Sequence, residues 1–303
     1  MIDFKPIKIE DKDKYEKLLF SDSEKGCEYS FANLFLWGRQ KIATVYDDIV
    51  FFSQFNRKTV YPFPIGKSDK KAVIEELIRD SEERGISLRI TGLGQNEIEF
   101  ISKTFPDKFI FHCDRDSYDY IYDINDLADL GGKKYDGKRN HIKRFYSLFP
   151  DAVIEPLKDS NISKVQEMAE VWYDEKIKAN PQGDFTMEKA ALFKAFKNFE
   201  KLGLDGIAIR NGNEILAFTM GSKISNDTFD VHFEKAVPSA QGAYAVINQA
   251  FAKYIREKYP KISYLNREED MGLEGLRKAK LSYNPHHLVK KCWAHLMEDG
   301  YDY

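Results

Sequence analysis

The stretch Tyr264-Leu-Asn-Arg-Glu-Glu-Asp-Met-Gly-Leu-Glu-Gly-Leu-Arg-Lys-Ala-Lys-Leu-Ser-Tyr283 is the most informative part of the chain. It begins as an apolar strand, becomes polar from Asn266 to Asp270, and continues as a cationic helix. A strand that ends on an amide, a cation and carboxylates brings several reactive groups to one place. The structural alternative is a solvated loop followed by a charged helix face. The flanking Gly272 and Gly275 and the closing Tyr283 favour a functional site.

Composition predicts a folded protein with balanced charge. A length of 303 residues suggests two domains. The chain is 43% hydrophobic and 14% aromatic, which supplies enough side chains for packed cores. Charged residues make up 31% of the chain, yet the net charge is only −3. This balance argues against disorder and against a protein that coats nucleic acid over its whole surface.

Cysteine usage and the N-terminus indicate the compartment. Cys27, Cys113 and Cys292 lie far apart, which fits a reducing compartment and argues against a zinc ribbon or a disulfide framework. The N-terminus has no apolar signal region, and no window approaches the ~18 apolar residues of a membrane span. The histidines show no ligand spacing, so no metal site is predicted. We expect a soluble, cytoplasmic protein without a transmembrane segment.

The two halves of the chain repeat one order of elements: strand, two helices, antiparallel strands, helix, strand, helix, strand. In the first half we expect strands at 4–9, 42–46, 49–55 and 88–93, another within 109–123, helices at 11–20, 30–37, 69–84 and 95–105, and an irregular segment at 61–64. In the second half we expect strands at 152–157, 207–210, 214–224, 228–235, 262–265 and 287–296, with helices beginning near 163, 186, 242 and 273. This pattern predicts a mixed α/β (α+β) fold in which residues 1–124 and 151–303 form two domains. Residues 125–150 would be a basic linker helix.

The strand at 228–235 carries three ionisable residues at alternating positions. Asp230, His232 and Glu234 should therefore point to the same face of the sheet. A covered central strand is apolar on both faces, so three such residues predict a water-accessible cavity. An edge strand facing solvent is the alternative. In a cavity, Glu234 or His232 could accept a proton from an attacking amine or hydroxyl, and Asp230 could orient His232.

Two further segments carry groups that could bind anions. The segment 133–145 contains six Lys or Arg. A helix would place Asn140, Lys143 and Arg144 near one face with Arg139 adjacent, as a phosphate-binding surface or a solvated one. Arg277 and Lys280 share a helix face and could bind phosphate or carboxylate. Tyr283 could act as a general acid or be a core aromatic residue.

The element order of the second half resembles the GNAT fold of N-acyltransferases, in which two parallel strands splay apart to admit an acyl donor. Two such units in one chain resemble the Fem-type aminoacyltransferases and the phosphatidylglycerol lysyltransferase C-terminal-domain family. The matching segments are Ser30–Trp37, Gly137–Phe145 and, most specifically, Tyr264–Pro285. The resemblance implies tandem GNAT-like domains, each with a mixed central sheet flanked by helices. It also implies aminoacyl transfer from a tRNA ester, with aminoacyl-tRNA as cosubstrate and no tightly bound cofactor.

The phosphate loop of GNAT enzymes is only partly present. Gly242 matches its central glycine, but Ser239 stands in place of Gln or Arg and Tyr244 in place of a small residue. Acyl-CoA is therefore the alternative donor. We expect Asn266 or Arg267 to stabilise the oxyanion and Glu268 to contact substrate.

The full lysyltransferases carry a multi-helix membrane domain, and this chain has none. We therefore expect the acceptor to be a peptide, a small amine or a peripheral lipid headgroup. A non-catalytic tRNA- or metabolite-binding protein on the same scaffold is the third reading.

Overall fold

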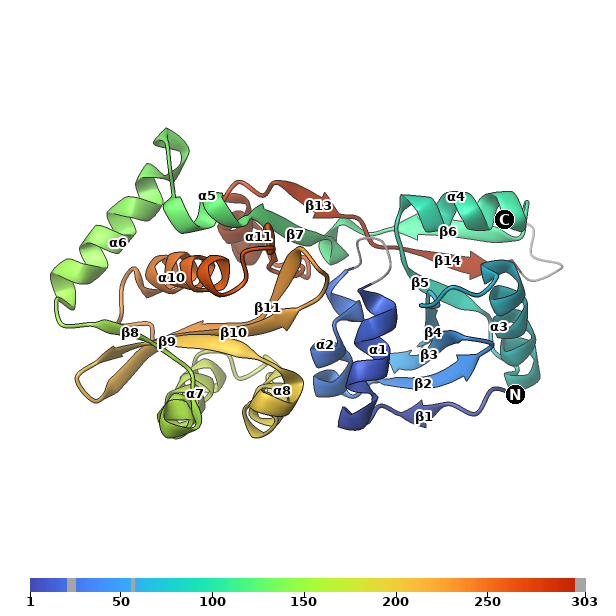
Figure 1. Ribbon diagram of the computed structural model, residues 1–303, viewed down its shortest axis with the longest axis horizontal. Coiled ribbons are helices and arrows are strands. Elements are labelled where there is room, and N and C mark those ends of the chain that lie inside the picture. Colours follow the sequence, from blue (N-terminus) through green and yellow to red (C-terminus); the bar gives the residue numbers. More distant parts are fainter. Residues whose placement is uncertain (21–25, 56–57, 298–303) are drawn as a thin grey trace. The chain divides into compact units, whose positions relative to one another are not determined.

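The computed structural model describes residues 1–20, 26–55 and 58–297, and it contains two mixed β-sheets that are each flanked by helices (Figure 1). The chain divides into two compact units. Unit 1 comprises Met1–Asp119, Glu269–Glu274 and Leu288–Tyr303, and unit 2 comprises Tyr120–Glu268 and Gly275–His287. Both sheets follow the same plan, since the fourth and fifth of seven strands form a parallel pair when the first sheet is counted from β1 and the second from β8.

In unit 1 the strand order is β1-β2-β3-β4-β5-β14-β6. The strands are β1 (Lys5–Pro6), β2 (Gln40–Val45), β3 (Asp48–Phe55), β4 (Lys58–Pro62), β5 (Arg89–Leu93), β6 (Phe109–Cys113) and β14 (Cys292–Leu296). The helices are η1 (Ile9–Asp11), α1 (Lys12–Leu19), η2 (Cys27–Tyr29), α2 (Phe31–Trp37), α3 (Lys70–Arg84), α4 (Gln95–Thr104) and η3 (Arg115–Ser117).

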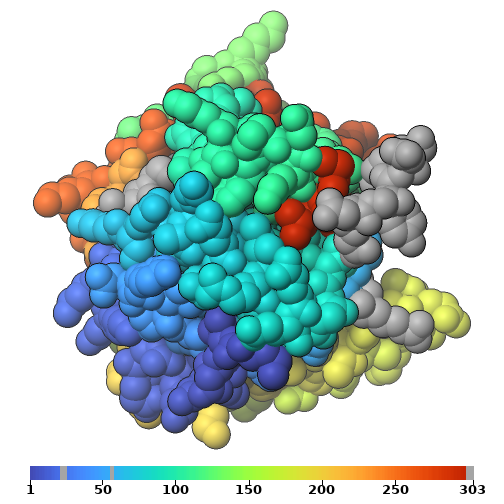
Figure 2. All heavy atoms as spheres, turned by 90° about the vertical axis from the view of Figure 1, so that its right-hand side faces the viewer, coloured from blue at the N-terminus to red at the C-terminus, as the bar shows by residue number. Residues whose placement is uncertain are grey.

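Helices cover both faces of this sheet. Val50 and Phe51 are neighbours in β3 and so point to opposite faces. Val50 joins a core that contains Leu77 of α3 and Ile101 of α4, the helices at the front of Figure 2. The ring of Phe51 lies 6.0 Å from that of Tyr15 in α1. The predicted hairpin and its flanking helices are therefore confirmed.

In unit 2 the strand order is β13-β7-β12-β11-β10-β9-β8. The strands are β7 (Asp119–Asp123), β8 (Val153–Pro156), β9 (Asp205–Asn211), β10 (Glu214–Lys223), β11 (Thr228–Ala236), β12 (Tyr264–Asn266) and β13 (His287–Val289). The helices are α5 (Ile124–Asp129), η4 (Lys133–Tyr135), α6 (Asp136–Leu148), α7 (Asp159–Ala179), α8 (Thr186–Lys197), α9 (Phe199–Leu202), α10 (Ala243–Lys258) and α11 (Glu274–Leu281).

The second sheet also has a helix layer on each face. Helix α10 covers one face, and α7 and α8 cover the other (Figure 1). Phe229 of β11 meets Phe251 of α10 at 5.7 Å between ring centroids. Phe218 of β10 meets Phe196 of α8, also at 5.7 Å. Burial on both faces explains why β10 reads as a nearly continuous apolar run.

Each sheet includes a strand from the other half of the sequence. β14, near the C-terminus, lies between β5 and β6, while β7 lies beside β12. The single strand expected at 287–296 is wrong, because this segment forms β13 and β14 in different sheets. The expected boundaries near 124 and 151 therefore do not coincide with the two units. The expected division into domains at 1–124 and 151–303 stays a prediction.

The segment 61–64 was expected to be irregular because of its prolines, and this expectation is wrong for its first half. Tyr61 is fully buried in β4 and pairs with Ile90 of β5. Pro62 is the last residue of β4, where its missing N–H is tolerated.

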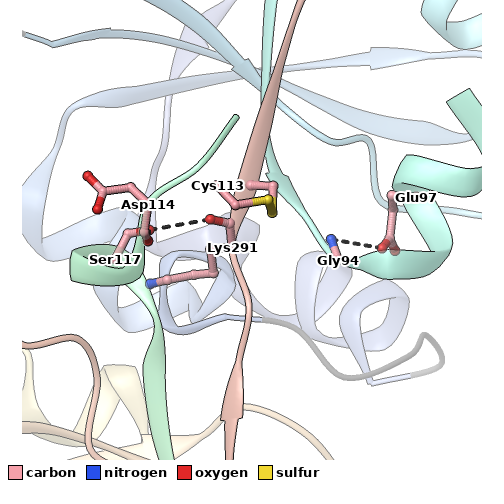
Figure 3. Close-up of a disulfide and its surroundings, with 7 residues drawn as sticks. Gly94, Glu97, Cys113, Asp114, Ser117 and Lys291 are labelled. Carbon is pink, nitrogen blue, oxygen red and sulfur yellow. Dashed lines mark hydrogen bonds between the residues drawn. A yellow bond between two sulfur atoms is a disulfide. The ribbon is translucent and has the colours of Figure 1, made fainter. Parts of the chain in front are cut away.

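One disulfide joins Cys113 of β6 to Cys292 of β14 (Figure 3). This bond was not expected, because the spacing of the cysteines argued against a disulfide framework. Their separation of 179 residues gives no signal in the sequence. The bond arises because β14 inserts beside β6 with these two residues directly paired. Cys27 is buried and is not part of a disulfide.

The close approach of β10 and β11 leaves no room for a side chain at Gly221 of β10. A Cβ atom at Gly221 would lie 1.9 Å from the carbonyl oxygen of Asp230. We expect Gly221→Ala to lower the free energy of unfolding by about 1–3 kcal/mol, because overpacking forces the two strands apart. Gly131→Ala is the control, since a Cβ there meets nothing within 4 Å. Equal urea-unfolding free energies for the two variants would contradict this packing.

Candidate functional site

The parallel ladder between β11 and β12 is short. It consists of three residue pairs and ends at Asp230 and Asn266. Beyond that point β11 continues to Ala236 alongside β10 alone, while the chain leaves β12 for a polar loop. The side chains that follow the last pair on each strand therefore lie where the two strands no longer share hydrogen bonds.

The three ionisable residues of β11 do not share a face, so that expectation is wrong. Glu234 pairs with Thr219 of β10, and Asp230 pairs with Ser222. Thr219 and Ser222 are three residues apart and so point to opposite faces of the sheet. The register shifts between these pairs and leaves His232 without a partner in β10, which is a β-bulge. A bulge reverses the alternation that the sequence argument assumed.

Contacts identify the two faces. The ammonium of Lys235 lies 4.2 Å from the Trp172 ring of α7 and pairs with Glu188 of α8 at 2.5 Å. The neighbouring Glu234 therefore points to the opposite side, the α10 side. His232 bonds with Ser222 on the same side as Asp230, the α7–α8 side.

On the α10 side, Arg267 and Glu234 form an ion pair. Arg267 Nη2 donates to Glu234 Oε1 at 2.9 Å, and the two side chains are 14% and 11% exposed. The guanidinium lies 5.0 Å from the ring of Tyr283 and 5.8 Å from that of Tyr122. Its other terminal nitrogen, Nη1, is buried and has no hydrogen-bond acceptor among the described residues. A buried N–H without an acceptor is costly, so this nitrogen marks a place for a water or a ligand oxygen.

The loop that carries Arg267 is fixed from several directions. The Asn266 side chain accepts a hydrogen bond from the Glu268 N–H at 2.7 Å, and Glu268 has a φ of 55°. Lys280 is buried and donates to the carbonyls of Arg267 and Glu268 at 2.6 and 3.0 Å. Lys280 was expected to bind a substrate anion. The structure assigns it to positioning this loop, because backbone carbonyls hold its ammonium.

On the α7–α8 side, His232 forms a compact cluster. Its Nε2 lies 2.8 Å from Ser222 Oγ, and its Nδ1 lies 3.4 Å from both Asp230 Oδ2 and Glu268 Oε1. Two carboxylates beside Nδ1 favour a proton on that nitrogen, which leaves Nε2 to accept from the Ser222 hydroxyl. Ser222 was not predicted as a site residue, because nothing in the sequence distinguishes a lone serine in an apolar strand.

Lys138, at the start of α6, was also missed. Its ammonium lies 3.6 Å from the centroid of the Tyr283 ring and donates to Ser282 Oγ at 2.6 Å. Burial, and then the charge of Arg267, lower the pKa of Lys138 to about 8. Burial raises the pKa of Tyr283 to about 12, so its hydroxyl stays protonated as a general acid requires.

The other predicted binding residues of α6 differ in their contacts and exposure. Arg139 donates to the Gly132 carbonyl at 2.9 Å and also bonds to the Leu130 carbonyl and Asp136. The structure thus assigns Arg139 to the turn before α6, not to a phosphate. Asn140 and Lys143 are exposed and remain candidates for binding a substrate. Arg277 is half-buried on α11 and also stays a prediction.

Gly242 precedes α10 in a left-handed conformation, with a φ of 88°. A Cβ atom here would lie 2.4 Å from the carbonyl oxygen of His141 in α6. The N–H groups of Gln241 and Ala243 donate to backbone carbonyls. Close packing of α6 therefore gives a structural reason for the glycine, separate from a pyrophosphate cradle.

The decisive polar stretch is divided between the two units. Glu269 and Asp270 belong to unit 1, where Glu269 pairs with Lys291 at 2.6 Å. Lys291 also pairs with Asp119 at 2.7 Å and lies 3.6 Å from Cys27 Sγ. The expectation that the whole stretch serves one place is therefore wrong for these two carboxylates.

Two groups of described residues could hold a metal ion. Asp230, His232 and Glu268 have ligand atoms within 4.8 Å of one another, as do Cys27, Asp119 and Glu269. A nitrogen with two carboxylates suits several divalent cations. In the second group, the ammonium of Lys291 already supplies a positive charge. The expectation of no metal site stays a prediction.

The Arg267–Glu234 pair allows a double-variant test. Arg267→Met should lower the free energy of unfolding by about 3 kcal/mol, because Glu234 would be left buried and unpaired. The double variant Arg267→Met/Glu234→Gln should recover much of that loss. Urea unfolding of the wild type, both single variants and the double variant gives the coupling energy. Additive losses would contradict a direct ion pair.

Lys138 predicts a pH dependence of stability. Its pKa is about 8 in the folded protein and about 10.5 when unfolded. The unfolded chain therefore binds more protons between these values, and folding stability should rise with pH across that window and be lost as pH falls through 8. Unfolding free energies of the wild type should rise relative to those of Lys138→Met from pH 8 to 10.5. The exposed Lys143→Met should show no such divergence, and parallel curves for Lys138→Met would contradict the prediction.

Comparison with known proteins identifies the family. The family described as phosphatidylglycerol lysyltransferase, C-terminal, matches residues 22–295. A conserved protein of unknown function from Bacteroides thetaiotaomicron VPI-5482 is 39% identical, with a TM-score of 0.92 over 98% of this chain and 100% of that one. The C-terminal domain of a putative lysylphosphatidylglycerol synthetase from Agrobacterium fabrum is 12% identical, with a TM-score of 0.68 over 94% and 91%.

FemX, whose crystal structure is known, is 8% identical with a TM-score of 0.57 over 98% of each chain. At such identity the likeness shows the fold alone, and it agrees with the GNAT-like arrangement of two mixed sheets flanked by helices. Within the described ranges, none of the helices has both the length and the apolar character needed to cross a membrane. Because the family match extends over most of the sequence, the resemblance is confirmed, and the chain belongs to the phosphatidylglycerol lysyltransferase C-terminal family.

Proposed function

We propose that this protein is an acyltransferase that moves an aminoacyl group from an aminoacyl-tRNA to the hydroxyl or amine of an acceptor. One observation carries the proposal: beyond the last β11–β12 pair, Arg267 and Glu234 form a nearly buried ion pair, and no residue that the structure describes accepts from Arg267 Nη1. A fixed cation with an unused N–H suits a carbonyl oxygen that becomes negatively charged during acyl transfer. Membership of the lysyltransferase family supports an activated aminoacyl ester as donor.

The chemistry requires one attack and one proton transfer. The acceptor attacks the ester carbonyl, a new bond to the carbonyl carbon forms, and the bond to the tRNA 3′ oxygen breaks. Arg267 stabilises the oxyanion, and Glu234, expected from the sequence to act as a base, instead holds the guanidinium in place. The ester is already activated, so no covalent enzyme intermediate is needed.

His232 is the better candidate for the base. Its Nδ1 lies beside Glu268, the residue after Arg267, so a proton from the acceptor would reach the imidazole around the end of the β11–β12 ladder, and Ser222 holds the ring in place at Nε2. Asp230 and Glu268 support the positive charge that results. The proton then returns to the 3′ oxygen that leaves. Arg267 and Glu268 are consecutive residues that reach Glu234 and His232, so one loop contacts both groups.

The region around Gly242 favours tRNA over coenzyme A as donor. Backbone carbonyls already accept from the N–H groups of Gln241 and Ala243, and α6 packs against Gly242. A pyrophosphate at this helix start would compete with those bonds. The acceptor stays open among a lipid headgroup, a peptide and a small amine.

Transfer assays test this function. Pools of tRNA charged with labelled amino acids are incubated with phosphatidylglycerol vesicles, peptides and small amines, and labelled acceptor is measured. We expect transfer by the wild type and a loss of about 100-fold or more in folded Arg267→Lys and His232→Gln variants, because each removes a group that acts in the transition state.

Lys164→Met, at an exposed position of α7, is the matched control and should keep wild-type rates. A parallel assay supplies acetyl-CoA with the same acceptors. Acetylation without any transfer from charged tRNA would overturn the proposal in favour of an acyl-CoA-dependent enzyme. Binding of tRNA without turnover of either donor would indicate a binding protein.

A further inference from the structure

Two cations and one carboxylate meet around Tyr283 on the α10 side of the second sheet. Arg267 and Lys138 both lie against the Tyr283 ring, at 5.0 and 3.6 Å from its centroid. Glu234 pairs with Arg267. Within the described residues, no carboxylate pairs with Lys138, whose hydrogen-bond partner is the neutral Ser282 hydroxyl. The site therefore carries an excess of positive charge.

The hydrogen bonds at this place are also incomplete. Arg267 Nη1 is a buried donor with no acceptor among the described residues. An ammonium has three donors, and Lys138 uses one of them on Ser282. The charge of Lys138, which no carboxylate among the described residues balances, suits a ligand with a negative charge and several acceptor oxygens. A phosphodiester has both properties, and it would leave Arg267 Nη1 to the neighbouring ester carbonyl.

The residues around Tyr283 come from separate parts of the chain, as is typical of a ligand-binding site. Lys138 comes from the start of α6, Ser282 and Tyr283 follow α11, and Arg267 follows β12. The carbonyl of Tyr283 accepts from the buried Tyr135 hydroxyl at 3.0 Å, which fixes the ring that both cations share. Three separate elements thus hold both cations against one tyrosine ring.

We propose that Lys138 binds the phosphate of a phosphodiester subsite next to Arg267. The subsite rests on the proposed transferase function and extends it, because a tRNA donor and a phospholipid acceptor both carry this group. In a tRNA, the last phosphodiester is separated from the aminoacyl ester by a single ribose, so Lys138 would hold that phosphate while Arg267 reaches the ester carbonyl. In a phospholipid, the headgroup phosphodiester would occupy the same place.

Calorimetric titration of the full chain separates the sources. One probe is a trinucleotide ending in Cyt-Cyt-Ade with its phosphodiesters intact, and the second is glycerophosphoglycerol. Adenosine and glycerol are uncharged controls. We expect one of the two phosphodiester probes to bind and the uncharged compounds not to bind. The preferred probe then names the source of the phosphate.

Variants place the binding at Lys138. Lys138→Met should weaken the preferred probe by about tenfold, and Lys138→Arg should stay within about threefold, because charge and reach are kept. Lys164→Met should bind like the wild type. Equal binding by wild type and Lys138→Met, or no binding of either probe, would overturn the subsite.

Different results would contradict the transferase function and the phosphodiester subsite. Binding that depends on Lys138, without aminoacyl transfer, would leave the subsite standing and remove the transferase function. Aminoacyl transfer at unchanged KM and kcat in Lys138→Met would remove the subsite and leave the function standing.

Discussion

One extra residue in β11 determines how the site is arranged. Because the register against β10 shifts at His232, Glu234 and His232 point to opposite faces of the second sheet. Hydrogen bonding between β11 and β12 stops at Asp230 and Asn266, and the loop that follows sends consecutive side chains to both faces. Arg267 meets Glu234 on one side, and Glu268 meets His232 on the other. One short loop thus links a cationic group on one face of the sheet to a proton acceptor on the other.

The energetics of this arrangement favour an occupant. A nearly buried arginine is tolerated because Glu234 neutralises it and because backbone bonds through Lys280 fix its loop. Lys138 adds a second charge that no carboxylate among the described residues of unit 2 pairs with, and burial together with the charge of Arg267 lowers its pKa to about 8. A donor that carries an ester and a neighbouring phosphodiester would supply an acceptor for Arg267 Nη1 and a negative charge beside Lys138.

Local patterns predicted most of the elements, and long-range pairing escaped them. The hairpin at β2–β3, the helix capped by Asp69 and Gly85, and the family from Tyr264–Pro285 followed from neighbouring residues. The exchange of β7 and β14 and the Cys113–Cys292 bond depend on partners over a hundred residues away, for which spacing gives no signal. The bulge at His232 interrupts the alternation of side chains along β11, on which the prediction of a shared face depended. Lys138 was overlooked because exposed lysines surround it in the sequence, and only packing against Tyr283 distinguishes it.

A structure with a non-hydrolysable donor analogue tests the central claim most directly. The analogue is a Cyt-Cyt-Ade trinucleotide whose terminal 3′ position carries an amide-linked amino acid in place of the ester. The geometry predicts that the amide carbonyl oxygen accepts from Arg267 Nη1 and that the last phosphodiester contacts Lys138. An analogue bound away from Arg267, with Nη1 still lacking an acceptor, would contradict this role of the ion pair.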